Sequence, residues 1–327
     1  MPARRLTIDA RLDALNDLNP TVDPDAQQQI AAALADKHYR VVAKAATLAG
    51  EAQLYAHEAD LLAAYRRFLR DPVKRDPNCV AKRAISRALV DLDCNDAGFF
   101  LDGLTYRQME PVWGGSVDTA IDVRCQCARG LVACGYPRAL QELTLLLNDA
   151  EVPARLGAVR AIACGQPREA ELLLRFKALS GDPEPAVVGE CLSGLLSIEP
   201  DESPDFVAAF LHADDEAVAE LAALALGESR LNAALPLLQS AWDDIVLDRG
   251  FKRVLIRAAA MQRSEPAFDW LISIAQDEHP GLAGEVLEAL SIYRGNAKLA
   301  KRLEEAVAAR GDVSLGELFE RVWKTSA

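Results

Sequence analysis

The sequence predicts an all-α protein in which pairs of helices stack in a linear array. Seven nine-residue windows align without gaps, and they begin at Ala81, Val123, Ala154, Val187, Val218, Lys252 and Leu282. The steps between successive windows are 42, 31, 33, 31, 34 and 30 residues. A period of this length is typical of helical repeats that bury one another by stacking. We therefore expect one α-solenoid of about eight helical pairs.

Each window is expected to form a helix with one buried stripe. The fifth position is apolar in every copy: Ile85, Cys127, Ala158, Cys191, Ala222, Ile256 and Val286. The ninth position is apolar as well: Leu89, Leu131, Ile162, Leu195, Leu226, Ala260 and Leu290. The eighth is always Ala or Gly: Ala88, Gly130, Ala161, Gly194, Ala225, Ala259 and Ala289. Because these positions share one helical face, we expect a buried stripe with a close helix crossing at the eighth residue.

A second helix is expected after four of the windows. A proline lies 13 to 17 residues after the window start and begins an apolar run in each case, at Pro137, Pro167, Pro204 and Pro266. Proline fits the first turn of a helix, since its missing N–H would be unpaired there in any residue. Each repeat is therefore expected to be a helix, a short turn and a second helix.

The windows, among them VRCQCARGL and ARLGAVRAI, resemble the HEAT-repeat superfamily of α-solenoids. The similarity is greatest to short bacterial HEAT-like repeats, which also occur in phycobilin lyase subunits, and it extends over roughly residues 23–310. The resemblance implies a right-handed α-α superhelix of the HEAT/armadillo type. Members of the superfamily act as scaffolds, cofactor-attachment enzymes, hydroxylases and DNA glycosylases, so the resemblance implies an architecture rather than one activity.

The expected organisation is a single solenoid over residues 1–327. It comprises a leading segment (1–22), irregular repeats (23–98, with a helix starting at Asp23 and Pro24), an inserted loop (99–117), regular repeats (118–310) and a C-terminal capping helix (311–327). Ser314 and Glu317 have the spacing of a capping box at the start of that last helix. A terminal helix of this kind is expected because the last repeat must be covered.

Composition favours a cytoplasmic protein that does not cross a membrane. No run approaches the ~18 apolar residues of a membrane span, and the first residues lack the apolar core of a secretory signal. The seven cysteines form an odd set without a CxxC pair. We therefore expect reduced thiols and a reducing compartment.

Charge is distributed unevenly along the chain. No Lys or Arg lies between Lys177 and Arg230, whereas twelve carboxylates do, and eight basic residues lie between Arg66 and Arg87. A solvated surface that maintains solubility is one explanation of the acidic zone. The other is attraction of a protein partner with a basic surface, for which the candidate contacts are Glu190, Asp214, Asp215, Glu216 and Glu220.

The segment from Phe99 to Ala120 is the least repeat-like part of the chain, and it is rich in aromatic residues. Ordered insertions in solenoids often lie on the binding face. The candidate contacts of a partner or ligand are Tyr106, Arg107, Met109, Glu110 and Trp113. The alternative is a segment whose rings fill the seam between two irregular repeats.

Catalytic motifs are missing from the sequence. It contains no GxxxxGK[ST], GxSxG or HExxH pattern. HEAT-repeat hydroxylases bind iron through several His-Glu dipeptides, and this chain has one, His57-Glu58. We therefore expect no catalytic residues, no metal site and no cofactor.

The function expected from the sequence is that of a non-enzymatic scaffold for protein binding or assembly, with the oligomeric state left open. One alternative is a HEAT-like DNA glycosylase, which would use Trp113, Asp118 and the arginine cluster. The acidic zone argues against nucleic acid, because its carboxylates repel phosphates. A second alternative, a bilin lyase-like subunit, rests on the repeat type alone.

Overall fold

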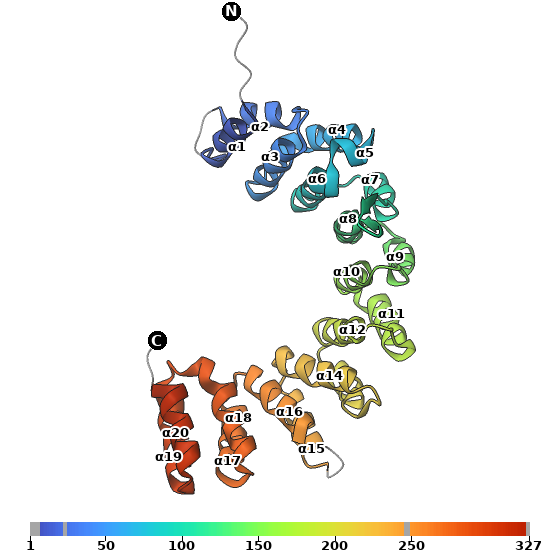
Figure 1. The fold of residues 1–327 in the computed structure, drawn as a ribbon. Helices are drawn as coiled ribbons and strands as arrows, with labels where there is room; N and C mark the ends of the chain where they lie inside the picture. Colours follow the sequence, from blue (N-terminus) through green and yellow to red (C-terminus); the bar gives the residue numbers. More distant parts are fainter. Residues whose placement is uncertain (1–6, 22–24, 245–248, 325–327) are drawn as a thin grey trace, which may run out of the picture. The chain divides into compact units, whose positions relative to one another are not determined.

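The computed structural model describes residues 7–21, 25–244 and 249–324, and its regular structure is almost entirely helical (Figure 1). The chain divides into two compact units, Met1–Ala170 and Glu171–Ala327. Helix α11 (Pro167–Ser180) contains the boundary between them. One continuous solenoid over the whole chain stays a prediction. None of the described helices combines the length and apolar composition that are needed to cross a membrane.

The first unit contains short helices and one β-hairpin. Its elements are α1 (Ile8–Asn16), α2 (Ala26–Leu34), α3 (Tyr39–Glu51), η1 (Tyr55–His57), α4 (Glu58–Phe68), α5 (Pro72–Arg75), η2 (Pro77–Cys79), α6 (Val80–Asp91), α7 (Ala97–Leu104), β1 (Met109–Val112), β2 (Gly115–Asp118), α8 (Ile121–Ala133), α9 (Ala139–Leu147) and α10 (Val152–Ile162). Helices α3, α6, α8 and α10 pack consecutively, each against the next. Helices α2, α4, α7 and α9 each pack against a member of this series.

The second unit has the same local arrangement. Its elements are α12 (Pro185–Ile198), α13 (Ser203–Ala208), η3 (Ala209–His212), α14 (Glu216–Ser229), α15 (Ala234–Trp242), α16 (Arg249–Met261), α17 (Glu265–Asp277), α18 (Pro280–Leu290), η4 (Ser291–Tyr293), α19 (Ala297–Arg310), α20 (Val313–Phe319) and the π-helical turn η5 (Glu320–Lys324). Helices α12, α14, α16, α18 and α20 pack consecutively, and α13, α15, α17 and α19 pack against them. Within each unit the chain therefore alternates between a helix of the consecutive series and a flanking helix.

The windows form the buried faces of this series. Each window lies in a single helix, in α6, α8, α10, α12, α14, α16 or α18. Every residue at the fifth and ninth window positions is at most 3% exposed. The predicted buried stripe is confirmed at these two positions, and burial of this apolar area contributes ~25 cal/mol per Å² to stability.

The small eighth position follows the expectation less regularly. It is buried in five of the seven windows, but Gly194 and Ala289 are half-buried. Ala88 does lie at a close crossing, because a Cβ atom on Gly50 of α3 would be 3.0 Å from its Cα. In α14 a close approach to α16 lies at Gly227, two residues after the eighth position. A Cβ atom on Gly227 would be 2.3 Å from the carbonyl oxygen of Ala258 in α16.

Three of the four prolines expected to begin a helix do so. Pro167, Pro204 and Pro266 lie in the first turns of α11, α13 and α17. Pro137 lies in a turn two residues before α9 begins at Ala139. The expected helix start at Asp23 and Pro24 is outside the described residues, and α2 begins at Ala26.

The expected C-terminal helix forms as α20 and η5. Its apolar side chains Leu315, Phe319 and Trp323 are buried, and the indole Nε1 of Trp323 donates a hydrogen bond of 3.0 Å to the carbonyl oxygen of Leu287 in α18. The N-cap is Asp312, whose carboxylate accepts from the backbone N–H of Leu315. Ser314, the expected cap, lies inside the helix.

Residues 99–117, which we expected to form a loop, are mostly regular structure. Helix α7 extends to Leu104, and β1 and β2 pair antiparallel, with Val112 opposite Gly115. The two residues between the strands are Trp113 and Gly114, and Gly114 has φ 88°. Glycine adopts a positive φ without steric cost, which allows this tight two-residue turn. The segment is therefore a helix end followed by a β-hairpin.

We predict that Gly227→Ala destabilises the second unit by about 1–3 kcal/mol, because the added methyl group meets the backbone of α16 rather than a side chain that can move. Gly316→Ala in α20 is the matched control, since a Cβ atom there has no atom within 4 Å. The control is expected to be neutral or stabilising by up to ~1 kcal/mol. Urea unfolding measures both variants. Equal stabilities would contradict the close crossing of α14 and α16.

Candidate functional site

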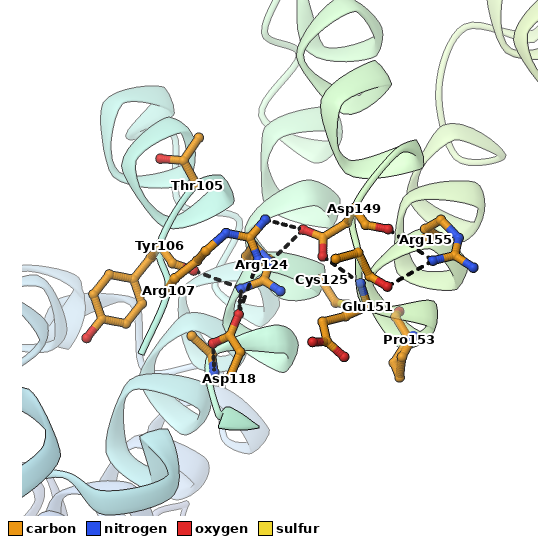
Figure 2. Close-up of polar contacts among 12 residues, drawn as sticks. Thr105, Tyr106, Arg107, Asp118, Arg124, Cys125, Asp149, Glu151, Pro153 and Arg155 are labelled. Carbon is orange, nitrogen blue, oxygen red and sulfur yellow. Dashed lines mark hydrogen bonds and ion pairs between the residues drawn. The ribbon is translucent and has the colours of Figure 1, made fainter. Parts of the chain in front are cut away.

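The hairpin is joined to the neighbouring helices of the first unit by four side chains of alternating charge. We call them the Arg–Asp cluster (Arg107, Asp118, Arg124 and Asp149). Figure 2 shows the two guanidinium groups between the two carboxylates. Nη1 of Arg124 is 2.6 Å from Oδ2 of Asp118, and its Nε is 3.3 Å from Oδ2 of Asp149. Arg107 contacts the same two carboxylates, at 3.3 Å from Asp118 and 2.8 Å from Asp149. The cluster connects the hairpin, helix α8 and the turn between α9 and α10.

Most of the cluster is removed from water. The side chain of Arg124 is 1% exposed, and those of Asp118 and Asp149 are 3% exposed. Buried charges of this kind need close partners, because desolvation otherwise costs several kcal/mol per ion. Backbone amides of Gln108 and Ala120 also donate to Oδ1 of Asp118. Burial raises the pKa of Asp118. The hydrogen bonds from Ala120 and Gln108 and the contact with Arg124 lower it by more, so the pKa lies below its usual range.

A second polar network surrounds Glu110, in the first strand of the hairpin. Its Oε1 accepts hydrogen bonds from the backbone N–H of Asn78 (2.6 Å), the hydroxyl of Thr119 (2.7 Å) and Nε2 of Gln108 (2.8 Å). The hydroxyl of Tyr106 donates to Oε1 of Gln108 at 2.8 Å. Burial raises the pKa of Glu110, but the three hydrogen bonds to its carboxylate lower it below the usual range. The hairpin is therefore attached to the turn before α6 as well as to α8.

The segment before α6 contributes Asp76 to a fully buried ion pair with Lys82 of α6. Nζ of Lys82 is 2.8 Å from Oδ2 of Asp76, and both side chains have no exposure. Asp76 also accepts from the backbone amides of Ala81 and Lys82 at the start of α6. Lys82 is one of the eight basic residues between Arg66 and Arg87, and its burial removes it from the surface. Burial also raises the pKa of the adjacent Cys79 thiol to about 11, so this thiol stays protonated at neutral pH.

The tip of the hairpin is exposed. Trp113 is 102% exposed, and Met109 and Val112 are about half exposed. A tryptophan that filled a seam between repeats would instead be buried by the surrounding helices. The hairpin thus combines a polar, buried base with an apolar, exposed tip.

The residues that we predicted from this segment have different environments. Met109 and Trp113 lie at the surface, whereas Glu110 is buried at the hairpin base. Arg107 is half exposed and paired with two carboxylates, and Tyr106 is half-buried. The polar groups of Tyr106, Arg107 and Glu110 stabilise the hairpin, so the exposed candidates are Met109 and Trp113.

The predicted acidic contacts belong to the second unit. Asp214, Asp215, Glu216 and Glu220 are exposed, and they lie together at the start of α14. Asp215 is the N-cap, and its carboxylate accepts from the backbone N–H of Ala217. Glu190 lies in α12, is half-buried and has a partner of its own.

The buried charges were not predicted, although the sequence carries a signal for them. The second position of three successive windows is Lys82, Arg124 or Arg155, and an aspartate lies six residues before each, at Asp76, Asp118 and Asp149. In the structure the first two are direct ion pairs. The third basic residue, Arg155, donates to the backbone carbonyl oxygen of Asp149 at 3.0 Å. This spacing therefore marks a polar contact before each of α6, α8 and α10.

The geometry also bears on catalytic use of Asp118, the residue that a glycosylase-like mechanism would need. Its Oδ1 accepts hydrogen bonds from two backbone amides, and its Oδ2 pairs with Arg107 and Arg124. Both carboxylate oxygens are thus engaged by the protein itself. Within the described residues, no group of three His, Cys, Asp or Glu side chains is arranged to bind a metal ion. All seven cysteines lie in the described part of the chain and are free thiols.

The site is thus a surface hairpin with an exposed aromatic tip, fixed at its base by buried charges. No protein-family model matches this chain, and no curated protein matches it at a significant level.

We predict that Arg124→Met destabilises the first unit by about 3–5 kcal/mol, because it leaves Asp118 and Asp149 buried with half of their positive partners removed. Arg83→Met is the matched control. Arg83 pairs with Asp122 between α6 and α8, but both side chains are more than half exposed, so its loss is expected to cost about 0–1 kcal/mol. The measurement is urea unfolding, and similar losses for both variants would refute the structural role of the cluster.

Proposed function

We propose that this chain is a non-enzymatic protein-binding scaffold whose helices form a right-handed α-solenoid of the HEAT type. The consecutive packing of α3, α6, α8 and α10, and of α12, α14, α16, α18 and α20, supports the repeat architecture. The recurring Asp-to-basic spacing before α6, α8 and α10 supports it further, because Arg124 of one repeat also pairs with Asp149 of the next. Stacked repeats of this kind expose a continuous surface for binding.

The observation that carries the binding proposal is the full exposure of Trp113 at the tip of a hairpin with a buried base. Tryptophan is among the residues that contribute most to binding energy at protein interfaces. A rigid support lowers the entropy that is lost on binding, because the anchor is already in position. Met109 and Val112 add apolar surface beside it.

The acidic residues at the start of α14 supply a second element of the proposal. Asp214, Glu216 and Glu220 are exposed and have no basic residue near them in sequence. The negative electrostatic potential of these carboxylates accelerates association with a positively charged partner and disfavours acidic partners. The proposed partner is therefore a protein with a basic surface, and we propose no cofactor.

We predict that Trp113→Ala weakens binding of a partner protein and leaves the fold intact. The affinity should fall by roughly 30-fold or more, which corresponds to about 2 kcal/mol for an interface anchor, while unfolding stability changes by less than ~0.5 kcal/mol because the side chain is exposed. Quantitative affinity capture from the native cell compares wild type, Trp113→Ala and Tyr55→Ala. Tyr55 is the matched control, as an exposed aromatic residue elsewhere in the first unit.

The expected pattern is a set of proteins retained by wild type and Tyr55→Ala and lost from Trp113→Ala. If Trp113→Ala retains the same proteins in the same amounts, the hairpin tip is not the binding element and the proposal fails.

A further inference from the structure

The first unit carries a basic patch, which we define as Arg66, Arg70, Lys74 and Arg75. Arg66 lies in the last turn of α4, Arg70 between α4 and α5, and Lys74 and Arg75 on α5, and all four are exposed. None of them forms an ion pair with any residue that the structure describes. The neighbouring basic residues are already engaged: Arg83 pairs with Asp122, and Arg87 pairs with Asp91. The exposed apolar side chains of Leu69 and Val73 lie in the same stretch.

The second unit carries an acidic patch, which we define as Asp214, Asp215, Glu216 and Glu220. All four side chains are exposed, and none forms an ion pair within the described parts of the chain. Glu216 and Glu220 are four residues apart on α14, a spacing at which like charges repel each other by a few tenths of a kcal/mol. The carboxylates therefore gain from a cationic surface that no described residue of the second unit supplies.

We propose that the basic partner of the acidic patch is the basic patch of a second copy of this chain. The inference rests on the proposed function, in which the acidic residues bind a basic protein surface. Each patch has four unpaired charges, and the two have opposite signs. Because the two patches are different surfaces of the same chain, a first contact leaves one unused patch on each of the two copies. If the two unused patches meet each other, the product is a closed dimer, and otherwise repetition of the contact gives an open chain of subunits or a larger ring.

The net charge of −13 sets the conditions under which such a contact forms. Whole molecules repel one another at very low salt. At about 0.1 M salt the Debye length is about 10 Å, so charges far from the contact are screened while the touching patches still attract each other. At about 1 M salt the screening length falls to about 3 Å, and the attraction between the patches is also weakened. Self-association should therefore occur at about 0.1 M salt and decrease at about 1 M.

The test uses the full chain and two patch variants, measured by sedimentation velocity over a range of protein concentrations. The basic-patch variant combines Arg70→Gln, Lys74→Gln and Arg75→Gln, which remove positive charge without reversing it. The acidic-patch variant combines Asp214→Asn, Glu216→Gln and Glu220→Gln, which remove negative charge without reversing it, and it retains Asp215 because that residue caps α14. Lys298→Glu with Lys301→Glu is the control, since it changes exposed charges on α19 outside both patches. Circular dichroism establishes that each variant keeps its helix content.

Wild type and the control are expected to form dimers or larger species at about 0.1 M salt. Each patch variant alone should associate at least about tenfold more weakly. An equimolar mixture of the two variants should form species of two chains and none larger, because each variant keeps one competent patch. Wild-type chains that stay monomeric, or variants that associate as wild type does, would overturn the inference. Binding of another protein through Trp113 by a monomeric chain would leave the proposed function intact.

Discussion

The buried guanidinium of Arg124 contacts the carboxylates of Asp118 and Asp149, which belong to different structural elements. Asp118 ends the hairpin, Arg124 lies in the first turn of α8, and Asp149 lies in the turn before α10. Buried charges tolerate little displacement, because any separation leaves them without water and without a partner. Arg124 is therefore the most deeply buried of the side chains that fix the hairpin relative to α8 and α10, and Arg107 pairs with the same two carboxylates from the surface.

This constraint explains how an insertion can interrupt a series of helices and still be ordered. A two-stranded hairpin is marginally stable by itself in water, and this one adds side-chain bonds to Asp118 and Glu110 at its base. The polar residues are used at the base, so the apolar residues remain at the tip. Trp113 is thereby presented on a fixed support, which is the arrangement that favours binding over seam filling.

The helical series could be predicted because its signal is periodic. The apolar fifth and ninth positions recur in seven windows, and each copy reinforces the assignment. The hairpin could not be recognised in the same way, since β1 and β2 have four residues each and no clear alternation. The burial of Lys82 could not be predicted, because lysine is rarely buried unless it is paired. Its partner, Asp76, lies six residues earlier in the sequence and carries no recognisable signal by itself. Similarly, Ser314 has the capping-box spacing, but α20 begins at Val313. The N-cap is therefore Asp312, whose carboxylate accepts from the backbone N–H of Leu315.

Hydrogen exchange at the hairpin base tests the central claim most directly. The amides of Asn78, Gln108 and Thr119 donate to Glu110, Asp118 and Gln108 in the structure. If the base is fixed to the helical series, these amides should exchange about as slowly as amides in the buried part of α8, such as that of Leu131, because they open only with the surrounding unit. Exchange at the rate of an unstructured loop, with α8 still protected, would contradict the account.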